Sequence, residues 1–394
     1  MTFRYANGVP TSTENATADI LKAAADPKVI SFGGGLPAPE LFPVEKMKAA
    51  ADKVFDKYGQ SVLQYAETLG YPELRKQIVK LMHDRDVETT FDNVGVVGGS
   101  QQAIDLVARM LINPGDVVIT EDPTYLAAID VFNSYGAKMV GVEMDEDGIK
   151  TDALAKTLKE YPEAKFIYTI PNFQNPTGRT MTVERRKELV KVADEAGVPV
   201  VEDDPYGAIR YAGEFLPSLK HFDKDDNVIY LSSFSKVLAP GMRMGWLVAS
   251  KEFMAKFTII KQNADLHSDN LTQYIIAQFL EDNDIYAHIK KITDVYEHRA
   301  NLMLQLIDEK FPKNVHHSTP EGGMFIWVEV PGVHTEDLFK ECIKHNVAFV
   351  PGSAFYANAG KDGTFRMNFS NMNDEQIKEG IDRMAKALKV VMPK

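Results

Sequence analysis

Between residues 94 and 250, short apolar runs alternate with segments of helical periodicity, and this alternation restricts the chain to few folds. Most runs are almost continuously apolar, as is typical of strands covered by helices on both faces. One helical segment, 183–196, ends before Gly197, where a helix stop is expected. The pattern predicts an α/β fold, with a large, doubly wound domain around a mostly parallel, seven-stranded sheet. The seven runs are 94–97, 117–120, 138–142, 166–170, 198–201, 228–231 and 244–248.

A second unit follows this region. Residues 251–310 are mainly helical in pattern, with one long helix expected over 284–311. Strand and helix patterns then alternate, which indicates a smaller α+β unit. The first fifty residues are rich in Gly, Pro and Ala, so we expect them to pack against this unit. The predicted division is an N-terminal segment (1–50), a large domain (51–290) and a small domain (291–394). The short elements expected in the small domain are strands at 324–330, 347–350 and 364–370 and helices at 336–345 and 374–390.

Composition narrows the class of protein. The 394 residues carry 44 Lys and Arg against 56 Asp and Glu, a net charge of -12, which argues against nucleic acid or an anionic membrane as partner. No apolar stretch approaches the roughly 18 residues of a membrane span. The single cysteine, Cys342, forms no intrachain disulfide, and the sequence offers no Cys and His cluster for a metal. We predict a cytoplasmic protein without a metal site.

Two polar segments follow strands near the middle of the chain, where open α/β sheets bind ligands. Residues 96–103 run from a strand through a glycine turn into a helix, whose free N–H groups can bind an anion, although such turns are common. Residues 171–178 contain Asn-Pro and Thr-Gly, which favour turns whatever their function. Each segment alone is a weak signal.

Two further segments carry ionisable groups. Residues 202–206 place acids at a strand end near a tyrosine, although such acids more often cap a helix. In 232–245, Lys236 lies among hydroxyl groups, with Arg243 seven residues later. A surface lysine is the ordinary interpretation. Because Lys236 follows an apolar strand, however, desolvation could lower its pKa, as imine chemistry requires.

Taken together, these segments resemble the class I and II aminotransferases, pyridoxal-phosphate enzymes of fold type I. The motifs that carry the resemblance are 175–178 (Asn-Pro-Thr-Gly), the spacing of Asp203 and Tyr206, and 233–236 (Ser-Phe-Ser-Lys) followed by Arg243. They occur in the family's order, and the resemblance covers nearly the whole chain. Segments 33–43, 99–102 and 121–125 are similar to the subgroup of 2-aminoadipate, kynurenine and aromatic aminotransferases.

The resemblance implies a role for each residue around the cofactor, pyridoxal 5'-phosphate. Lys236 would bind the cofactor aldehyde and then move the substrate proton. Asp203 would pair with the pyridine nitrogen, and is preferred to Asp204 because its spacing to Tyr206 matches the family. Tyr206 and Asn175 would hydrogen-bond the phenolic oxygen. Tyr125 would stack on the ring, although core packing is the ordinary role for such a tyrosine. The phosphate would be bound by Ser100, Gln101, Ser233, Ser235 and Arg243.

The resemblance also implies the substrate contacts. Arg366, otherwise an ordinary strand arginine, would bind the α-carboxylate with Asn175 and the backbone at Gly35. Tyr65 would reach the phosphate of a neighbouring subunit, which implies a homodimer with shared sites. Residues 15–21 lack the arginine that related 2-aminoadipate enzymes carry. We therefore predict ping-pong transfer (EC 2.6.1.-) from an aromatic or other large hydrophobic L-amino acid, with 2-aminoadipate as a further candidate, to 2-oxoglutarate.

Three alternatives stay open at this point. The lysine and the aspartate would also serve another pyridoxal-phosphate reaction, such as that of a C–S β-lyase. The same fold occurs as the effector-sensing domain of transcription regulators, which carry an N-terminal winged helix. The residues before 94 are occupied by family-like segments, so we expect no winged helix among them. A nicotinamide-dependent oxidoreductase would fit the α/β pattern, but 95–100 lacks the GxGxxG spacing.

Overall fold

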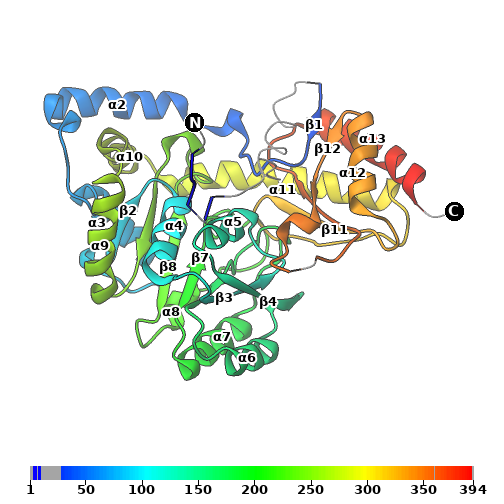
Figure 1. Cartoon of the computed structure of the whole chain (residues 1–394). Helices are drawn as coiled ribbons and strands as arrows, with labels where there is room; N and C mark the ends of the chain where they lie inside the picture. The colour runs from blue at the N-terminus through cyan, green and yellow to red at the C-terminus, as the bar shows by residue number, and fades with distance from the viewer. Residues whose placement is uncertain (1–2, 7, 10–27, 359, 393–394) are drawn as a thin grey trace.

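An eight-stranded sheet forms the centre of the large domain in this computed structural model, which describes residues 3–6, 8–9, 28–358 and 360–392 (Figure 1). The strand order is β2-β9-β8-β7-β6-β3-β4-β5. The pairs from β8 through β4 are parallel, whereas β9 runs antiparallel to both of its neighbours. The strands are β2 (Val94–Val97), β3 (Val117–Asp122), β4 (Lys138–Asp145), β5 (Gly148–Ile149), β6 (Phe166–Thr169), β7 (Val200–Asp203), β8 (Val228–Ser233) and β9 (Gly245–Val248).

The mostly parallel sheet confirms the predicted fold class, with one strand more than expected. The extra strand, β5, has two residues and pairs antiparallel with the end of β4. Two residues are too few to form an apolar run, so no sequence pattern could indicate it.

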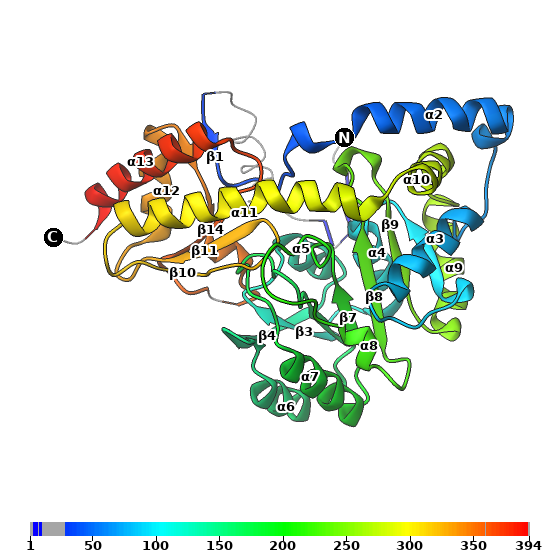
Figure 2. The same cartoon turned by 180° about the vertical axis from the view of Figure 1, so that it is seen from behind.

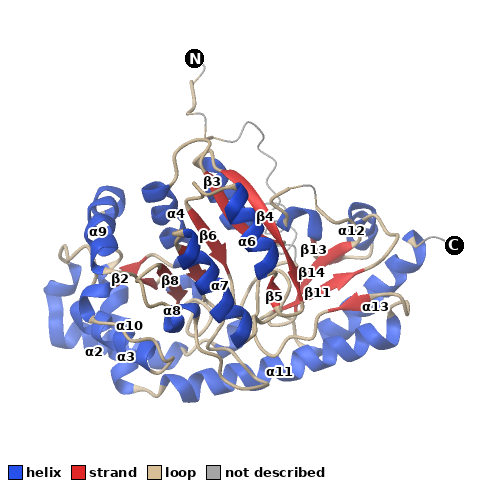
Figure 3. Cartoon of the chain, turned by 90° about the horizontal axis from the view of Figure 1, so that it is seen from below, coloured by secondary structure: helices blue, strands red, loops and turns tan. Residues whose placement is uncertain are grey.

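Helices cover both faces of this sheet (Figures 1 and 3). One face carries α4 (Ser100–Leu111) and α5 (Leu126–Ser134), and the other carries α6 (Thr151–Glu160), α7 (Val183–Ala196) and α8 (Leu219–Phe222). Helix α7 begins where the Thr182 side chain accepts from Arg185 N, and it ends at Gly197 in the left-handed conformation, φ 66°. The doubly wound arrangement leaves the carboxyl ends of the central strands open to a ligand.

Further helices flank the β2 side of the sheet, and one long helix leaves it. Helix α11 (Ile285–Lys310), 26 residues long, runs from the large domain along the smaller body (Figure 2). Its N-cap, Asp284, accepts from Tyr286 N and Ala287 N, which satisfies N–H groups of the first turn. The flanking helices are α2 (Val44–Tyr58), α3 (Pro72–His83), α9 (Lys251–Asp265) and α10 (Asn270–Asp282). The 3-10 helices are η1 (Pro39–Leu41), η2 (Gly59–Leu63), η3 (Phe91–Asn93), η4 (Pro240–Met242) and η5 (Gly352–Phe355).

The smaller body contains an antiparallel sheet in the order β10-β11-β14-β13. Helix α13 (Asp374–Val391) packs against both α11 and α12 (Thr335–Lys344). The expected strand at 347–350 is two strands, because β12 (Val347–Ala348) pairs with β1 (Ile30–Ser31) while β13 pairs with β14. The sheet strands are β10 (His316–His317), β11 (Phe325–Glu329), β13 (Val350–Pro351) and β14 (Thr364–Asn368).

Residues 30–38 lie against the smaller body, whereas α2, which begins at Val44, packs against α10. Phe32 N donates to Ala348 O at 2.8 Å, and Asn368 N donates to Phe32 O at 2.7 Å. Ala38 N donates to the Tyr296 hydroxyl of α11 at 3.1 Å. Through these hydrogen bonds, residues 32–38 connect strands of the smaller body with helix α11. The exact domain boundaries stay a prediction. Among the described helices, none combines the length and the apolar character that a membrane span needs.

Candidate active site

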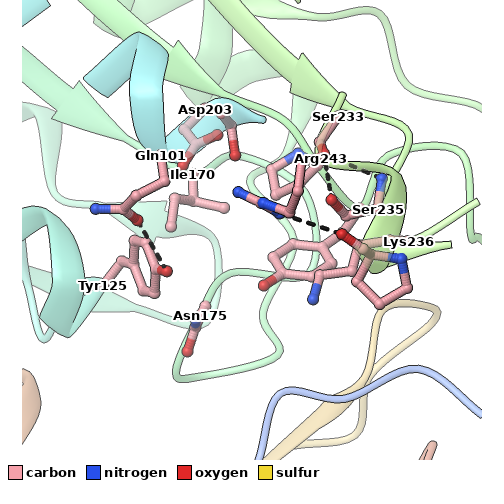
Figure 4. A pocket seen from close by; sticks show the side chains of 13 residues that line it. Gln101, Tyr125, Ile170, Asn175, Asp203, Ser233, Ser235, Lys236 and Arg243 are labelled. Carbon is pink, nitrogen blue, oxygen red and sulfur yellow. Dashed lines mark hydrogen bonds between the residues drawn. The ribbon is translucent and has the colours of Figure 1, made fainter. Parts of the chain in front are cut away.

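A cavity of about 150 Å³ lies beyond the ends of strands β6, β7 and β8, beside the start of α4 (Figure 4). The position is the one expected for a ligand in an open α/β sheet. All but three of the predicted site residues line it, and three residues that the sequence did not single out, Ile170, Pro205 and Pro240, complete the wall. The lining residues are Ser100, Gln101, Tyr125, Ile170, Asn175, Asp203, Pro205, Tyr206, Ser233, Ser235, Lys236, Pro240 and Arg243.

One end of the cavity is suited to a phosphate dianion. Gly99, at φ 92°, turns the chain into α4, whose first N–H groups have no partner within the helix. A Cβ at Gly99 would lie 2.7 Å from Nη2 of Arg243, so only glycine allows the guanidinium this close. Arg243 Nη2 donates to Gly98 O at 3.1 Å. The hydroxyls of Ser233 and Ser235, 2.9 Å apart, add further donors.

Asp203 carries an oxygen that the protein leaves without a partner. Its Oδ2 accepts from the Tyr168 hydroxyl at 2.7 Å, whereas its buried Oδ1 has no hydrogen-bond partner among the described residues. Burial raises the pKa of Asp203 to about 7, with a smaller contribution from Asp204 in the same direction. A protonated ring nitrogen fits Oδ1 and would stabilise the carboxylate. Asp204 offers no such oxygen, since its side chain accepts from Asn172, Gly207 N and Tyr230.

Lys236 is half-buried and lies within reach of the same cavity. Its Nζ donates to Gly35 O at 2.8 Å. Burial lowers the pKa of Lys236 to about 8, and the positive charges of Arg366 and Arg243 act in the same direction. Near neutral pH, Lys236 is therefore neutral more often than an ordinary lysine. The neutral amine Nζ can act as a nucleophile and as a base.

Two tyrosines and an amide surround the centre of the cavity. The Tyr125 hydroxyl donates to Oε1 of Gln101 at 3.2 Å, the dashed contact at one side of Figure 4. Burial raises the pKa of Tyr125 to about 12 and raises the pKa of Tyr206 further, so both hydroxyls stay protonated donors. Asn175 is 3% exposed and contacts Arg366. These groups can hydrogen-bond an anionic oxygen or flank a planar ring.

Arg366 is a buried cation beside the cavity, in contact with Asn175 of the lining. It is 4% exposed, and its guanidinium lies 4.2 Å from the Phe325 ring centroid and 4.9 Å from that of Phe355. Nη1 donates to Asn175 Oδ1 at 2.7 Å and Nη2 to Gly33 O at 2.6 Å, while Nε has no partner in the described part of the chain. Burial lowers the pKa of Arg366 to about 10, so it remains charged at neutral pH. The group can bind a carboxylate.

The loop that carries Asn175 is anchored by Glu121, a member of the family-like segment 121–125 to which the sequence assigned no role of its own. Glu121, at the end of β3, accepts from Thr169 Oγ1 at 2.5 Å and from Gln174 Nε2 at 2.9 Å. Oε1 of Gln174 then accepts from the N–H and the hydroxyl of Thr177. This network fixes the turn on both sides of Asn175. Only the adjacency of β3 and β6 brings its members together.

Three predicted site residues lie elsewhere. Gly35 contributes its carbonyl to Lys236, and Arg366 reaches the site through Asn175. Tyr65 is 79% exposed and packs edge-on against His267 at 5.8 Å, outside the cavity of its own chain. Residues 15–21, where the missing arginine was noted, lie outside the described residues.

Comparisons with known proteins place this geometry in context. The family described as aminotransferase class I and II matches residues 27–384. Aromatic-amino-acid aminotransferase 1 of Thermococcus litoralis is 41% identical over 382 residues, covering 95% of this chain and 92% of that one. The 2-aminoadipate transaminase of Thermus thermophilus is 40% identical, covering 94% and 93%. The structure of Pyrococcus horikoshii kynurenine aminotransferase in complex with PMP superposes with a TM-score of 0.94 at 38% identity, covering 98% and 97%.

Proposed function

The chain belongs to the class I and II aminotransferases, and we propose that it transfers the amino group of an aromatic or other large hydrophobic L-amino acid to 2-oxoglutarate. Membership confirms the fold type, the aminotransferase activity and the pyridoxal-phosphate cofactor predicted from the sequence. It also favours transfer over β-elimination, effector sensing and nicotinamide chemistry. The individual roles of the site residues are part of the proposal.

The main support for an apolar amino donor is the small number of cationic side chains at the cavity. Among the described residues, Lys236 and Arg243 are the only cationic side chains in its lining, and Arg366 contacts that lining through Asn175. Lys236 is needed for chemistry, Arg243 for the phosphate and Arg366 for the α-carboxylate. A second carboxylate on the donor would therefore meet no cation in this lining, whereas an apolar side chain would meet Ile170 or Pro205. The two relatives, at 41% and 40% identity, do not decide between the donors. The acceptor, 2-oxoglutarate, rests on the family resemblance. Its second carboxylate is one carbon farther from the reacting carbon than that of aspartate, and we infer that it lies beyond this lining.

The described residues support the following division of labour. When bound, pyridoxal phosphate supplies a ring that accepts electrons from the substrate Cα. Arg366 fixes the α-carboxylate and so orients the Cα–H bond. Lys236 Nζ takes the proton from Cα. Asp203 Oδ1 holds a proton on the ring nitrogen. Because one set of residues serves donor and acceptor in turn, the reaction is ping-pong.

A panel of amino donors tests the substrate proposal. With 2-oxoglutarate at saturation, we expect kcat/KM for phenylalanine or tyrosine to exceed that for aspartate by about 100-fold, because burying an unpaired carboxylate is costly. We expect 2-aminoadipate to lie between them. Formation of the 2-oxo acid from each donor gives the measurement. Equal values for aspartate and phenylalanine would contradict the proposal, and release of ammonia without formation of glutamate from 2-oxoglutarate would contradict transfer itself.

The proposed assembly is a homodimer with shared active sites. Its support is Tyr65, a large aromatic side chain that is 79% exposed beside His267 and outside the cavity of its own chain. Leu63, two residues before it, is 69% exposed, and together they form an apolar surface that a second copy would cover. In the dimer, Tyr65 would donate to the phosphate in the other subunit.

Subunit complementation tests this assembly. Lys236→Ala and Tyr65→Ala homodimers should each lose activity, the first in chemistry and the second in cofactor affinity. After the two are mixed under exchanging conditions, the hybrid has one intact site, so we expect about a quarter of wild-type activity to return. Coupled assay and analytical ultracentrifugation follow the exchange. No recovery in a verified hybrid would contradict shared sites.

The cytoplasmic location and the absence of nucleic-acid and membrane partners remain proposals based on composition. Cys342 is buried in α12, and burial raises the pKa of its thiol to about 12, which suits an inert structural cysteine. A chain with one such thiol is compatible with a reducing compartment.

A further inference from the structure

Two tyrosine–carboxylate pairs occur in the central sheet with the same geometry. In β6 and β7, Tyr168 lies opposite Val201, and Asp203 follows Val201 by two residues. In β8 and β7, Tyr230 lies opposite Glu202, and Asp204 follows Glu202 by two residues. Because alternate residues of a strand share a face, each tyrosine reaches diagonally to its carboxylate, and the two pairs lie on opposite faces of the sheet.

Only one of the pairs faces the cofactor cavity. The Tyr168 hydroxyl donates to Asp203 Oδ2 at 2.7 Å, and Asp203 lines the cavity. Tyr168 is fully buried, and its ring packs edge-on against Phe132 of α5 at 5.5 Å, which holds the hydroxyl in place. In the other pair, the Tyr230 hydroxyl donates to Asp204 Oδ2 at 2.9 Å, and neither residue lines the cavity.

We propose that Tyr168 is a positioning residue, whose hydroxyl fixes the rotation of the Asp203 carboxylate so that Oδ1 is presented to the ring nitrogen of the cofactor. The inference rests on the proposed role of Asp203. Without the hydroxyl, neither oxygen of Asp203 would have a partner among the described residues, and a buried carboxylate without partners favours its neutral form. A neutral Asp203 cannot hold a proton on the ring nitrogen.

The surroundings of Asp203 make this single donor important. Burial raises the pKa of Asp203 to about 7, and the hydrogen bond from Tyr168 opposes that rise. Among the described residues, the other ionisable groups found to interact with Asp203 are Asp204, Glu121, Tyr125 and Tyr206. None of these four groups is a cation. The hydrogen bond from Tyr168 is therefore the interaction by which the described residues stabilise the ionised carboxylate of Asp203.

A comparison of Tyr168→Phe with Tyr230→Phe tests the proposal. Each change removes one hydroxyl bonded to one buried carboxylate and keeps the ring. The full-length chain, freed of cofactor, is titrated with pyridoxal phosphate between pH 6 and 9, and binding is followed by fluorescence. We expect Tyr168→Phe to weaken binding at pH 8 about tenfold, which is typical for loss of one hydrogen bond to a charged group, and Tyr230→Phe to change it less than about twofold.

The pH dependence has a definite sign. Binding requires ionised Asp203, so affinity falls as the pH drops through the pKa of this carboxyl. Loss of the Tyr168 bond raises that pKa, and we expect the fall in Tyr168→Phe to begin about one pH unit higher. Titration of Lys236 and of the cofactor phosphate is shared by wild type and both variants, so a shift confined to Tyr168→Phe reports on Asp203.

Asp203→Asn separates this inference from the role on which it rests. If Asp203→Asn binds cofactor as tightly as wild type, the role of Asp203 is wrong. If Asp203→Asn weakens binding but Tyr168→Phe and Tyr230→Phe behave alike, only the present inference fails. The double variant Tyr168→Phe/Asp203→Asn should bind no more weakly than Asp203→Asn, because Tyr168 acts through Asp203. Additive losses would overturn the proposal, and circular dichroism verifies that each variant is folded.

Discussion

Replacing Lys236 with alanine is expected to lower the rate of amino transfer by at least about 10⁴-fold, because one residue serves as both nucleophile and proton carrier. The cofactor should still bind, since Arg243, the serines and the start of α4 remain. The loss should therefore appear in kcat and not in cofactor occupancy. Single-turnover formation of the 2-oxo acid from phenylalanine, with cofactor at saturation, provides the measurement.

Covalent labelling identifies the lysine directly. Borohydride should fix the cofactor to one peptide of the wild-type chain, containing Lys236, and to none in Lys236→Ala. Lys251→Ala is the matched control, since this lysine is exposed at the start of α9 and forms an ion pair with Asp92. It should be labelled and active like wild type. A label on another lysine in the Lys236→Ala chain would refute the assignment.

The sequence was sufficient for the features that depend on local pattern. Apolar runs located every long strand of the large sheet, and Gly197 marked the end of α7. Lys236 and Arg243 could be predicted as site residues because they lie seven positions apart in one short motif, and residues of one loop stay close together after folding. The cavity contains both, which agrees with the expectation that polar groups after parallel strands meet at one edge of the sheet.

Contacts between strands distant in sequence could not be predicted. Glu121 anchors Gln174 because β3 lies next to β6, and Tyr168 reaches Asp203 because β6 lies next to β7. Tyr168 lies within an apolar run, where a tyrosine indicates only packing. Tyr168 has a carboxylate partner only because β7 lies next to β6. The order of the strands depends on the whole sheet and cannot be read from one segment of sequence.

The electrostatics of the site follow from the same assembly. A chain with a net charge of -12 needs a local positive potential to bind a phosphate and a carboxylate. Arg243 and Arg366 lie 123 positions apart in the sequence, yet both lower the pKa of Lys236. The lowered pKa of Lys236 therefore depends on the fold, which brings the two arginines close to this lysine. Arg366 has a second, separable effect on the substrate.

Substitution Arg366→Met should lower kcat/KM for phenylalanine by about 10² to 10³-fold, because a two-pronged, charge-assisted contact with the α-carboxylate is lost. Methionine is unbranched and apolar, which suits the space between Phe325 and Phe355. Arg366→Lys keeps the charge without the planar fork and should recover part of the loss.

The amine that lacks the carboxylate decides whether Arg366 binds the substrate or only supports the fold. For 2-phenylethylamine, the decarboxylated analogue of phenylalanine, the single-turnover rates of wild type and Arg366→Met should agree within about threefold, since neither complex contains a carboxylate to bind. The ratio of the rate with phenylalanine to the rate with 2-phenylethylamine should therefore be much smaller in Arg366→Met than in wild type. Equal losses for both substrates would mean that Arg366 acts on the shape of the site, through Asn175 and Gly33, and that the carboxylate is bound elsewhere.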